Sequence, residues 1–246
     1  MSWRRCSVEG KRLFLRFKAP FAAFRPFQSG SYRSTTPVPS PSAVYGLLLN
    51  LAAIEQRDEI EAPVTKIRLG LPDMKIAIGL PEASGNPSRS MQPRSELALL
   101  TQQLHGYPVG SSGQELAEKT YGSKFWIAPV TREVLVDLDF IVGVEADAGF
   151  VQRIVAGLNG ELEVPRYGLP FAGDNNFLFD RIDPIDPPKL ARWYERLARG
   201  SRPRRELCRL TVWIDRADNS RTDIGLFAPS DFVREPPESA WIPLPG

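Results

Sequence analysis

The sequence has only two cysteines and one histidine in 246 residues, which leaves little material for thiol or metal chemistry. Cys6 and Cys208 lie far apart and match no metal-ligand spacing, so we expect no disulfide between them. His105 stands in a polar stretch, where an exposed side chain is the usual outcome. No HExxH, GxSxG or phosphate-loop GKS/T motif occurs. We therefore expect no catalytic residue, no metal and no cofactor.

Long apolar runs are also missing. None approaches the roughly 18 residues that a membrane span needs, and the N-terminal residues 1–12 have no apolar signal region. These absences predict no membrane association and a cytoplasmic location. The hydrophobic share of 42% and charged share of 24% are typical of a globular protein of one large or two small domains.

Charge is segregated along the chain, although the net charge is only +2. Residues 1–36 and 189–209 are strongly basic, whereas acidic residues gather around 133–147 and in the last thirty residues. This pattern favours an anion-binding side and a separate protein-facing side, with an ordinary solvated surface as the alternative. Arginine dominates the basic runs, and its planar guanidinium pairs with phosphate and stacks on bases.

The segment from Lys11 to Leu49 is the most informative. It begins with two alternating sets of side chains: Leu13, Leu15 and Phe17 in one, and Arg12, Phe14, Arg16 and Lys18 in the other. A period of two predicts a strand with one face in the core. The other face would carry cations around an aromatic ring, which suits a polyanion with stackable bases. An edge strand with a merely solvated outer face fits the pattern equally well.

Further elements follow from local patterns. The first strand should end at Pro20, and Ser40-Pro41 predicts a capped helix that runs to about Arg57, with Tyr45 on its flank. Strands are predicted at 67–71 and 74–80. The polar stretch 82–124 is long for a connection inside a compact domain and predicts a hairpin or arm.

The second half has a strand at 134–144, a helix after Asp147 that ends at Gly160, a short strand at 177–179, a helix at 188–199 and a strand at 207–214. Up to residue 182 the order is strand, helix, strand, insert, strand, helix, strand. That is the split βαβ order of a ferredoxin-like domain, the scaffold of RRM proteins. We expect an α+β fold with a ferredoxin-like core at 1–182, a thumb-like β-hairpin insert at about 82–131, and a helix-strand extension at 183–246.

The loop from Pro165 to Phe177 is rich in glycine and proline but is not a dinucleotide fingerprint, because no helix follows it. Its glycines have two interpretations, which remain open. They permit tight turns, or they let an RNA strand approach the backbone. In the second case Arg166, Tyr167, Asn175 and Asn176 would contact the RNA.

The front of the chain resembles a known family. A basic strand, then Phe24–Phe27 (FRPF), then Tyr32–Leu49 (YRSTTPVPSPSAVYGLLL) is similar to the start of the Cas-five family. These are RAMP-type subunits of the CRISPR type I surveillance complex, Cascade. The polar insert lies where that family has its thumb, and the 165–177 loop resembles the one that closes the family's core. The resemblance covers about residues 11–182.

The resemblance implies a non-catalytic RNA-binding subunit for antiviral defence or RNA-guided DNA targeting. It would cap the five-prime handle of the guide RNA (crRNA), contact the backbone and large subunits, and meet target DNA through the complex. Whether that complex recruits a nuclease or transposition proteins stays open. The expected RNA-binding residues are Arg12, Phe14, Arg16, Lys18, Arg25, Tyr32, Arg33, Arg89, Arg94, Lys124, Arg166, Tyr167, Asn175 and Asn176.

Two alternatives remain. One branch of the family cleaves precursor guide RNA without metal, using Tyr, Lys and His. Tyr45 and His105 are available for such an endoribonuclease, but His105 has no adjacent lysine. The second alternative is a general RRM-like RNA binder outside any CRISPR system.

Overall fold

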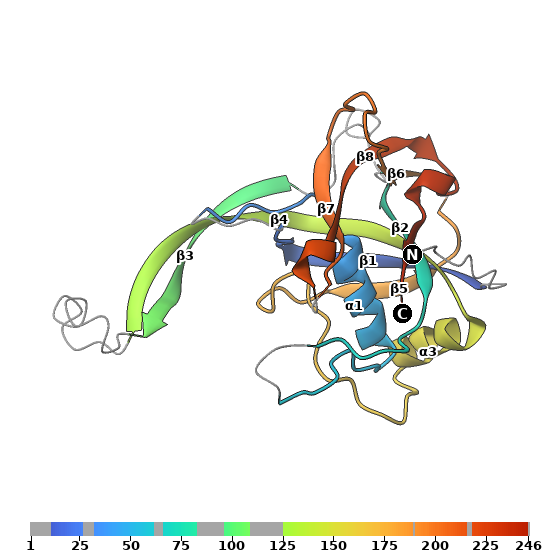
Figure 1. Cartoon of the computed structure of the whole chain (residues 1–246), viewed down its shortest axis with the longest axis horizontal. Helices are drawn as coiled ribbons and strands as arrows, with labels where there is room; N and C mark the ends of the chain where they lie inside the picture. Colours follow the sequence, from blue (N-terminus) through green and yellow to red (C-terminus); the bar gives the residue numbers. More distant parts are fainter. Residues whose placement is uncertain are drawn as a thin grey trace.

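The computed structural model describes residues 11–26, 32–61, 66–82, 96–108, 125–188, 190–215 and 218–245, without the side chains of 102–108, 125–130 and 219. Most of the described strands belong to one antiparallel sheet in the order β5-β1-β4-β2-β6-β8-β7, with β3 added to β4 and β9 to β2 (Figure 1). The bounds are β1 Lys11–Ala22, β2 Met74–Pro81, β3 Glu96–Pro108, β4 Phe125–Ala146, β5 Arg181–Ile185, β6 Ala191–Arg196, β7 Cys208–Trp213, β8 Asp223–Val233 and β9 Ile242–Leu244. The fold is mixed α/β with a mostly antiparallel sheet, as expected for the α+β class.

The two α-helices of the described part begin where the sequence predicts. In α1 (Pro41–Leu51) the Ser40 hydroxyl accepts a hydrogen bond from the Ala43 N–H at 3.3 Å. In α3 (Ala148–Asn159) Asp147 caps the first turn and Gly160 ends the helix at φ +75°. The extension of α1 to Arg57 is wrong, because Ala53 has φ +51° and turns the chain out of the helix. Neither helix is long and apolar enough to cross a membrane.

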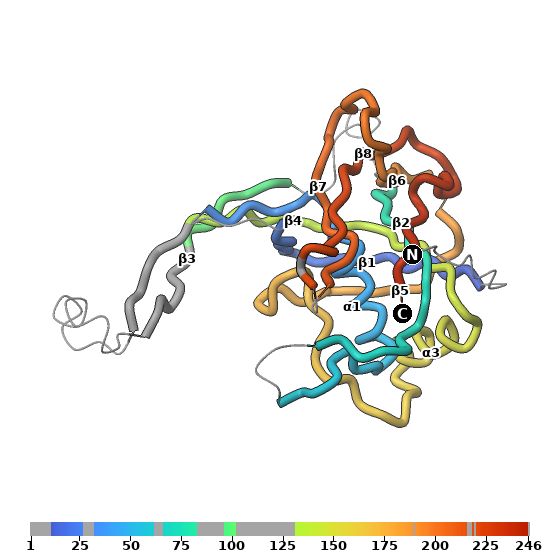
Figure 2. Tube along the Cα trace, viewed as in Figure 1, coloured from blue at the N-terminus to red at the C-terminus, as the bar shows by residue number. Residues whose placement is uncertain are grey.

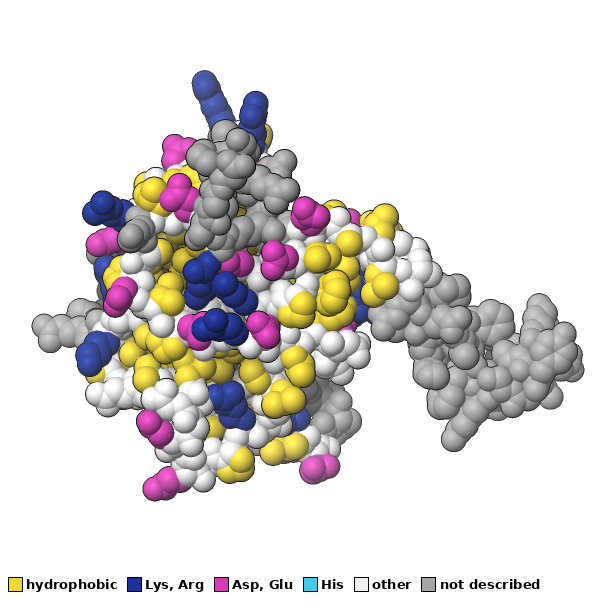
Figure 3. All heavy atoms as spheres, turned by 180° about the vertical axis from the view of Figure 1, so that it is seen from behind, with side chains coloured by type: hydrophobic (Ala, Val, Ile, Leu, Met, Phe, Trp, Pro, Cys, Tyr) yellow, Lys and Arg dark blue, Asp and Glu magenta, His cyan; other side chains and the backbone are white. Residues whose placement is uncertain are grey.

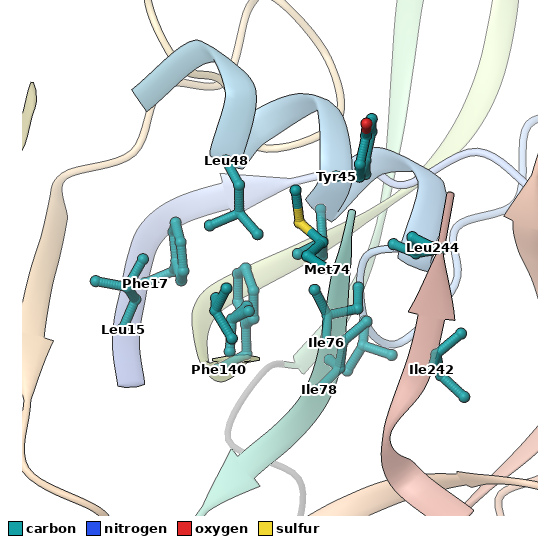
Figure 4. Packing of buried hydrophobic residues seen from close by; sticks show 14 of the residues in the cluster. Leu15, Phe17, Tyr45, Leu48, Met74, Ile76, Ile78, Phe140, Ile242 and Leu244 are labelled. Carbon is teal, nitrogen blue, oxygen red and sulfur yellow. The ribbon is translucent and has the colours of Figure 1, made fainter. Parts of the chain in front are cut away.

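The main core lies between the sheet and these helices (Figure 4). The Phe17 and Phe140 rings stack there with centroids 4.8 Å apart. Tyr45, predicted on the flank of α1, is buried instead and donates a hydrogen bond to the Pro72 carbonyl at 3.2 Å. Burial raises the pKa of Tyr45 to about 12.

A smaller apolar cluster covers part of the opposite sheet face. It contains Phe14, Ile141, Trp193 and Trp241. Phe14 is 7% exposed and its ring lies 6.1 Å from that of Trp193. Both faces of β1 therefore enter a core near Phe14, and the expectation of an open aromatic ring at this position is wrong.

Other parts of the chain also differ from the expectation. Residues 191–196 form strand β6 rather than part of a helix, and this strand pairs with β2. The Trp193 ring packs against Gly79 of β2, where a Cβ would overlap with it. Residues 67–71 and 177–179 make single bridges, Arg57 with Ile67 and Phe171 with Leu178, instead of strands. The acidic tail, which shows little pattern in the sequence, contributes β8 and β9.

The predicted arm is a β-hairpin in its described part. β3 pairs with β4 from Glu96 opposite Val136 to Pro108 opposite Phe125. The base of this hairpin leaves the body of the molecule as a continuation of β4 (Figures 1 and 2). Beyond residue 182 the same sheet continues, because β6 and β9 both pair with β2.

Candidate nucleic-acid interface

Two chain segments meet at the hairpin base, one after β1 and one before α1. The Phe24 N–H donates to the Thr35 hydroxyl and the Thr36 N–H to the Phe24 carbonyl, both at 2.8 Å. Arg33 forms a parallel bridge with Arg132 of β4, and its carbonyl accepts the Glu133 N–H at 2.8 Å. These bonds hold Arg33 against the hairpin, and the nearby charge of Arg25 lowers the pKa of Arg33.

The glycine-containing loop packs against the same place. The Ala23 N–H donates to the Ala172 carbonyl at 3.0 Å. Gly173 has φ +81°, and a Cβ there would overlap with the Ala23 carbonyl oxygen. At Gly173 the structure therefore shows the tight-turn role of glycine: it lets the loop close over the end of β1.

Three guanidinium groups gather here with one carboxylate among them. Arg132 is 2% exposed, and its Nη1 lies 2.9 Å from Asp174 Oδ2. Burial lowers the pKa of Arg33, the charges of Arg25 and Arg132 lower it further, and Asp174 raises it. Burial alone would raise the pKa of Asp174, but hydrogen bonds from Asn176 and Arg132 lower it on balance. Asp174 thus offsets one of the three positive charges. The Glu133 carboxylate, which accepts hydrogen bonds from Tyr32 and Thr35 close by, reduces the surplus to one positive charge, and this charge favours an anion.

Tyr32 and Glu133 complete this group. The Tyr32 hydroxyl donates to Glu133 Oε1 at 3.0 Å, and the Thr35 N–H donates to Oε2 at 2.8 Å. The hydrogen bond to Glu133 raises the pKa of Tyr32. Because Tyr32 is 50% exposed, its face remains open to a stacking partner.

A hollow of about 350 Å³ opens beside Arg25. Its walls come from the start of α1 and the end of β7, including Ser42, Tyr45 and Trp213. The Ser42 hydroxyl already donates to the Thr211 carbonyl at 3.1 Å. Arg25 therefore supplies a positive charge at the border of this hollow.

The cations of β1 are arranged differently from the expectation. Arg16 makes two hydrogen bonds to Asp139, at 2.8 and 2.7 Å. Arg12 bonds Glu145 at 3.0 Å, and Lys18 forms no ion pair with the residues that the structure describes. Figure 3, seen from the side opposite to Figure 1, shows basic and acidic side chains next to each other in the middle of the molecule. Carboxylates of β4 thus balance two of the three β1 cations that were predicted to bind RNA.

The predicted loop residues separate into two places. Arg166 donates to the Gly157 carbonyl at the end of α3, and Tyr167 lies near Asn50 at the end of α1. Asn176 donates to Asp174 at 2.8 Å, and Asn175 is exposed beside it. Only the two asparagines belong to the Arg33 group.

Some predicted residues lie outside the described part of the chain, and one residue of the site was not predicted from the sequence. Arg89, Arg94 and Lys124 lie outside the described residues, as does the side chain of His105. Arg132 was not predicted, although it interrupts the apolar alternation just before β4 enters the core. An arginine in phase with the apolar positions that begin at Val134 was the available signal.

The fold and this group of residues define an α+β protein with a projecting β-hairpin and a surplus of arginine at the hairpin base. The chain belongs to the family described as CRISPR-associated protein (Cas_Cas5), whose family model matches residues 12–162. The resemblance found in the sequence is thereby confirmed.

A solved structure of low sequence identity shares the fold. The chain is similar to one titled "CRISPR RNA-guided surveillance complex", with a TM-score of 0.52 and 14% identity over 90% of each chain. Another, "Crystal structure of Cas protein", has a TM-score of 0.46 and 13% identity, and covers 91% of this chain and 96% of that one. No curated protein matches the chain.

Proposed function

We propose that this chain is a non-catalytic RNA-binding subunit of a type I CRISPR surveillance complex, Cascade, that caps the five-prime handle of the guide RNA. It would contact the backbone and large subunits and reach target DNA through the complex. The observation that carries the proposal is the arginine surplus at the hairpin base, in a chain of the Cas_Cas5 family. The strand order β5-β1-β4-β2, with both helices against one core, supports the ferredoxin-like description. Its fourth strand is β5 (Arg181–Ile185) and not the segment 177–179 that the sequence predicts.

The chemistry of the hairpin base suits single-stranded RNA. Guanidinium groups bind phosphate oxygens through two parallel hydrogen bonds, which fixes the strand as well as attracting it. Tyr32 offers a half-exposed ring to an unstacked base beside these charges. Asn175 and Asn176 add amide donors and acceptors at the same edge.

The structure favours the hairpin base over the β1 strand as the main RNA contact. A phosphate at Arg12 or Arg16 would first have to displace Glu145 or Asp139. Arg25 and Arg33 form no salt bridge with the described residues, so their charges are available. Arg89, Arg94 and Lys124 keep the role that the sequence predicts for them along the hairpin.

The test is a double charge reversal, Arg25→Glu with Arg33→Glu, in the chain co-expressed with its complex and a repeat array. Removing a charge-assisted hydrogen bond weakens binding by about 1.5–3 kcal/mol. We therefore expect guide RNA recovered with the purified chain to fall at least about tenfold. The RNA is quantified against protein after affinity purification.

Arg221→Glu is the matched control, because Arg221 is 73% exposed and pairs only locally with Asp218. This variant should retain the guide RNA. An unchanged RNA content in the double variant would contradict the proposal.

A further inference from the structure

The connection between β6 and β7 carries a second set of arginines that the proposed function does not use. We call residues 197–207, together with Arg209 at the start of β7, the arginine loop. Arg199, Arg202, Arg205 and Arg209 are all exposed, and none forms an ion pair with the residues that the structure describes. The neighbouring arginines differ from these four because each of them forms an ion pair.

Those neighbours are paired and anchor the loop. Arg196 pairs with Asp223 at 2.6 Å, Arg192 with Glu206 at 2.7 Å, and Arg204 with Glu195. The second oxygen of Glu195 accepts the Ser239 hydroxyl at 2.6 Å. Since Glu206 is the only acid in the arginine loop and is bound to Arg192, the four unpaired charges are not balanced from within the loop.

The anchoring also presents the charges outward. Arg204 and Glu206 are both tied to β6, and Arg205 stands between them with its side chain exposed. Gly200 at φ +80° and Glu206 at φ +58° provide the turns that fold the loop back. Two ion pairs thus hold the arginine loop against β6 while its four unpaired arginines stay exposed.

The arginine loop is separate from the hairpin base. Trp213, at the far end of β7, borders the hollow beside Arg25. The six residues of β7 span about 17 Å at about 3.3 Å per residue. Figure 1 shows the β6–β7 connection at the top of the molecule, whereas the hairpin leaves sideways. Basic side chains project from the same end in Figure 3.

The composition of the arginine loop indicates which polyanion it fits. Among the described residues, the exposed aromatic side chains are Phe21, Tyr32, Tyr167 and Phe171, none of them in this loop. Proteins that bind single strands stack the bases on aromatic rings. A duplex hides its bases and presents phosphates, which arginine alone can contact.

We propose that the arginine loop binds the phosphate backbone of a DNA duplex. This inference goes beyond the capping of guide RNA, because it assigns a second nucleic acid to a different surface of the chain. The contact would be independent of sequence, since arginines that reach only phosphates carry no base readout. Its strength should therefore depend steeply on salt.

The test replaces Arg199, Arg202, Arg205 and Arg209 together, in one variant by alanine and in a matched variant by lysine. The full chain, alone and within its purified complex, is titrated with a fluorescent 30-base-pair duplex at several salt concentrations. We expect the alanine variant to bind at least about tenfold more weakly, and its salt slope to fall by about 1 for each phosphate that is no longer neutralised. The lysine variant keeps the charges and should bind within about threefold of the parent.

Three results would overturn the inference: an unchanged affinity and salt slope in the alanine variant, a larger loss on a single strand of equal length, or a loss of guide RNA from the complex. The Arg25→Glu, Arg33→Glu variant separates the two proposals, since it should lose guide RNA while the isolated chain still binds the duplex. If the parent chain never recovers guide RNA, the proposed function fails and the duplex measurement still stands.

Discussion

Asp174 is the residue on which the charge balance of the hairpin base depends. It faces the almost fully buried Arg132 and raises the pKa of Arg33, which two neighbouring arginines lower. Without this carboxylate, three guanidinium groups would repel one another at close range. The stability of the base should therefore follow the ionisation of Asp174.

We predict that Asp174→Asn lowers the free energy of unfolding by about 2 kcal/mol near neutral pH, because a buried arginine loses a charged partner. The lowered pKa of Asp174 gives the sign of the pH dependence. Its contribution is complete above the unfolded pKa of about 3.9 and is lost as the pH falls through the folded value. Urea unfolding at several pH values should show parent and variant converging at low pH.

Asp183→Asn is the control for this prediction. The Asp183 side chain is 42% exposed and pairs with the exposed Arg181. Pairs of that kind contribute little to stability. A similar loss in both variants would mean that Asp174 has no special role.

Arg16 and Phe14 show what a local sequence pattern leaves undetermined. Arg16 alternates with apolar residues as a solvated strand residue does, but its partner Asp139 is 123 positions away. Phe14 follows the same alternation and is covered by Trp193 and Trp241 from the C-terminal part. The local pattern predicted which face of the strand each side chain occupies. It did not predict which residues from other parts of the chain cover that face.

At the scale of elements, the contact between α1 and α3 depends on Gly157. A Cβ at this position would overlap with the Leu51 carbonyl oxygen, so the helices can approach only because position 157 has no side chain. Arg166 and Arg153 donate to carbonyls at the ends of the same two helices. The Arg166 bond ties the start of the 165–177 loop to this crossing.

We predict that Gly157→Ala destabilises the protein by about 1–3 kcal/mol, because backbone must move to admit the methyl group. Gly46→Ala in α1 is the matched control: its Cβ would meet only the flexible Gln56 side chain at 3.6 Å. That variant should gain up to about 1 kcal/mol from helix propensity. Thermal unfolding of both variants measures the difference, and equal effects would contradict the packing argument.

Elements with strong local signals were predicted well. Ser40 and Asp147 start helices because their side chains bond the first free N–H groups. The segment around Trp193 was predicted as a helix because Leu190, Trp193 and Leu197 recur at helical spacing. The segment instead forms β6, which pairs with β2 on one side and β8 on the other. Pairing on both sides overrides the helical pattern of the local sequence.

At the scale of the whole molecule, the N-terminal and C-terminal parts share one sheet. Residues of β7, β8 and β9 (Leu210, Phe227, Ile242 and Leu244 among them) belong to the same core as Phe17 and Leu48. The hollow beside Arg25 also needs both parts, since Trp213 and Ser42 border it together. The basic run at 189–209 is therefore positioned by the sheet strands β6 and β7, at a distance from the hairpin base.

We predict that the whole chain does not cleave RNA. The one residue of the alternative endoribonuclease pair whose side chain is described, Tyr45, is buried and bonded to Pro72, so its hydroxyl is poorly placed to reach an RNA 2′-hydroxyl. Purified chain incubated with repeat RNA in EDTA should leave the RNA intact, as judged on a denaturing gel beside a scrambled RNA. Specific cleavage that disappears in His105→Ala would establish the nuclease instead.

The sequence by itself determined the capped helices, the alternating strands, the projecting hairpin, the family and the two basic runs. These follow from spacing and capping over a few residues, where local physical chemistry suffices. Only the tertiary structure decided which cations remain free. Carboxylates of β4 balance Arg12 and Arg16, whereas Arg25, Arg33 and the four exposed arginines Arg199, Arg202, Arg205 and Arg209 form no ion pair with the described residues. The partners of Arg12 and Arg16 are more than a hundred residues away in the sequence, so no local pattern encodes this pairing.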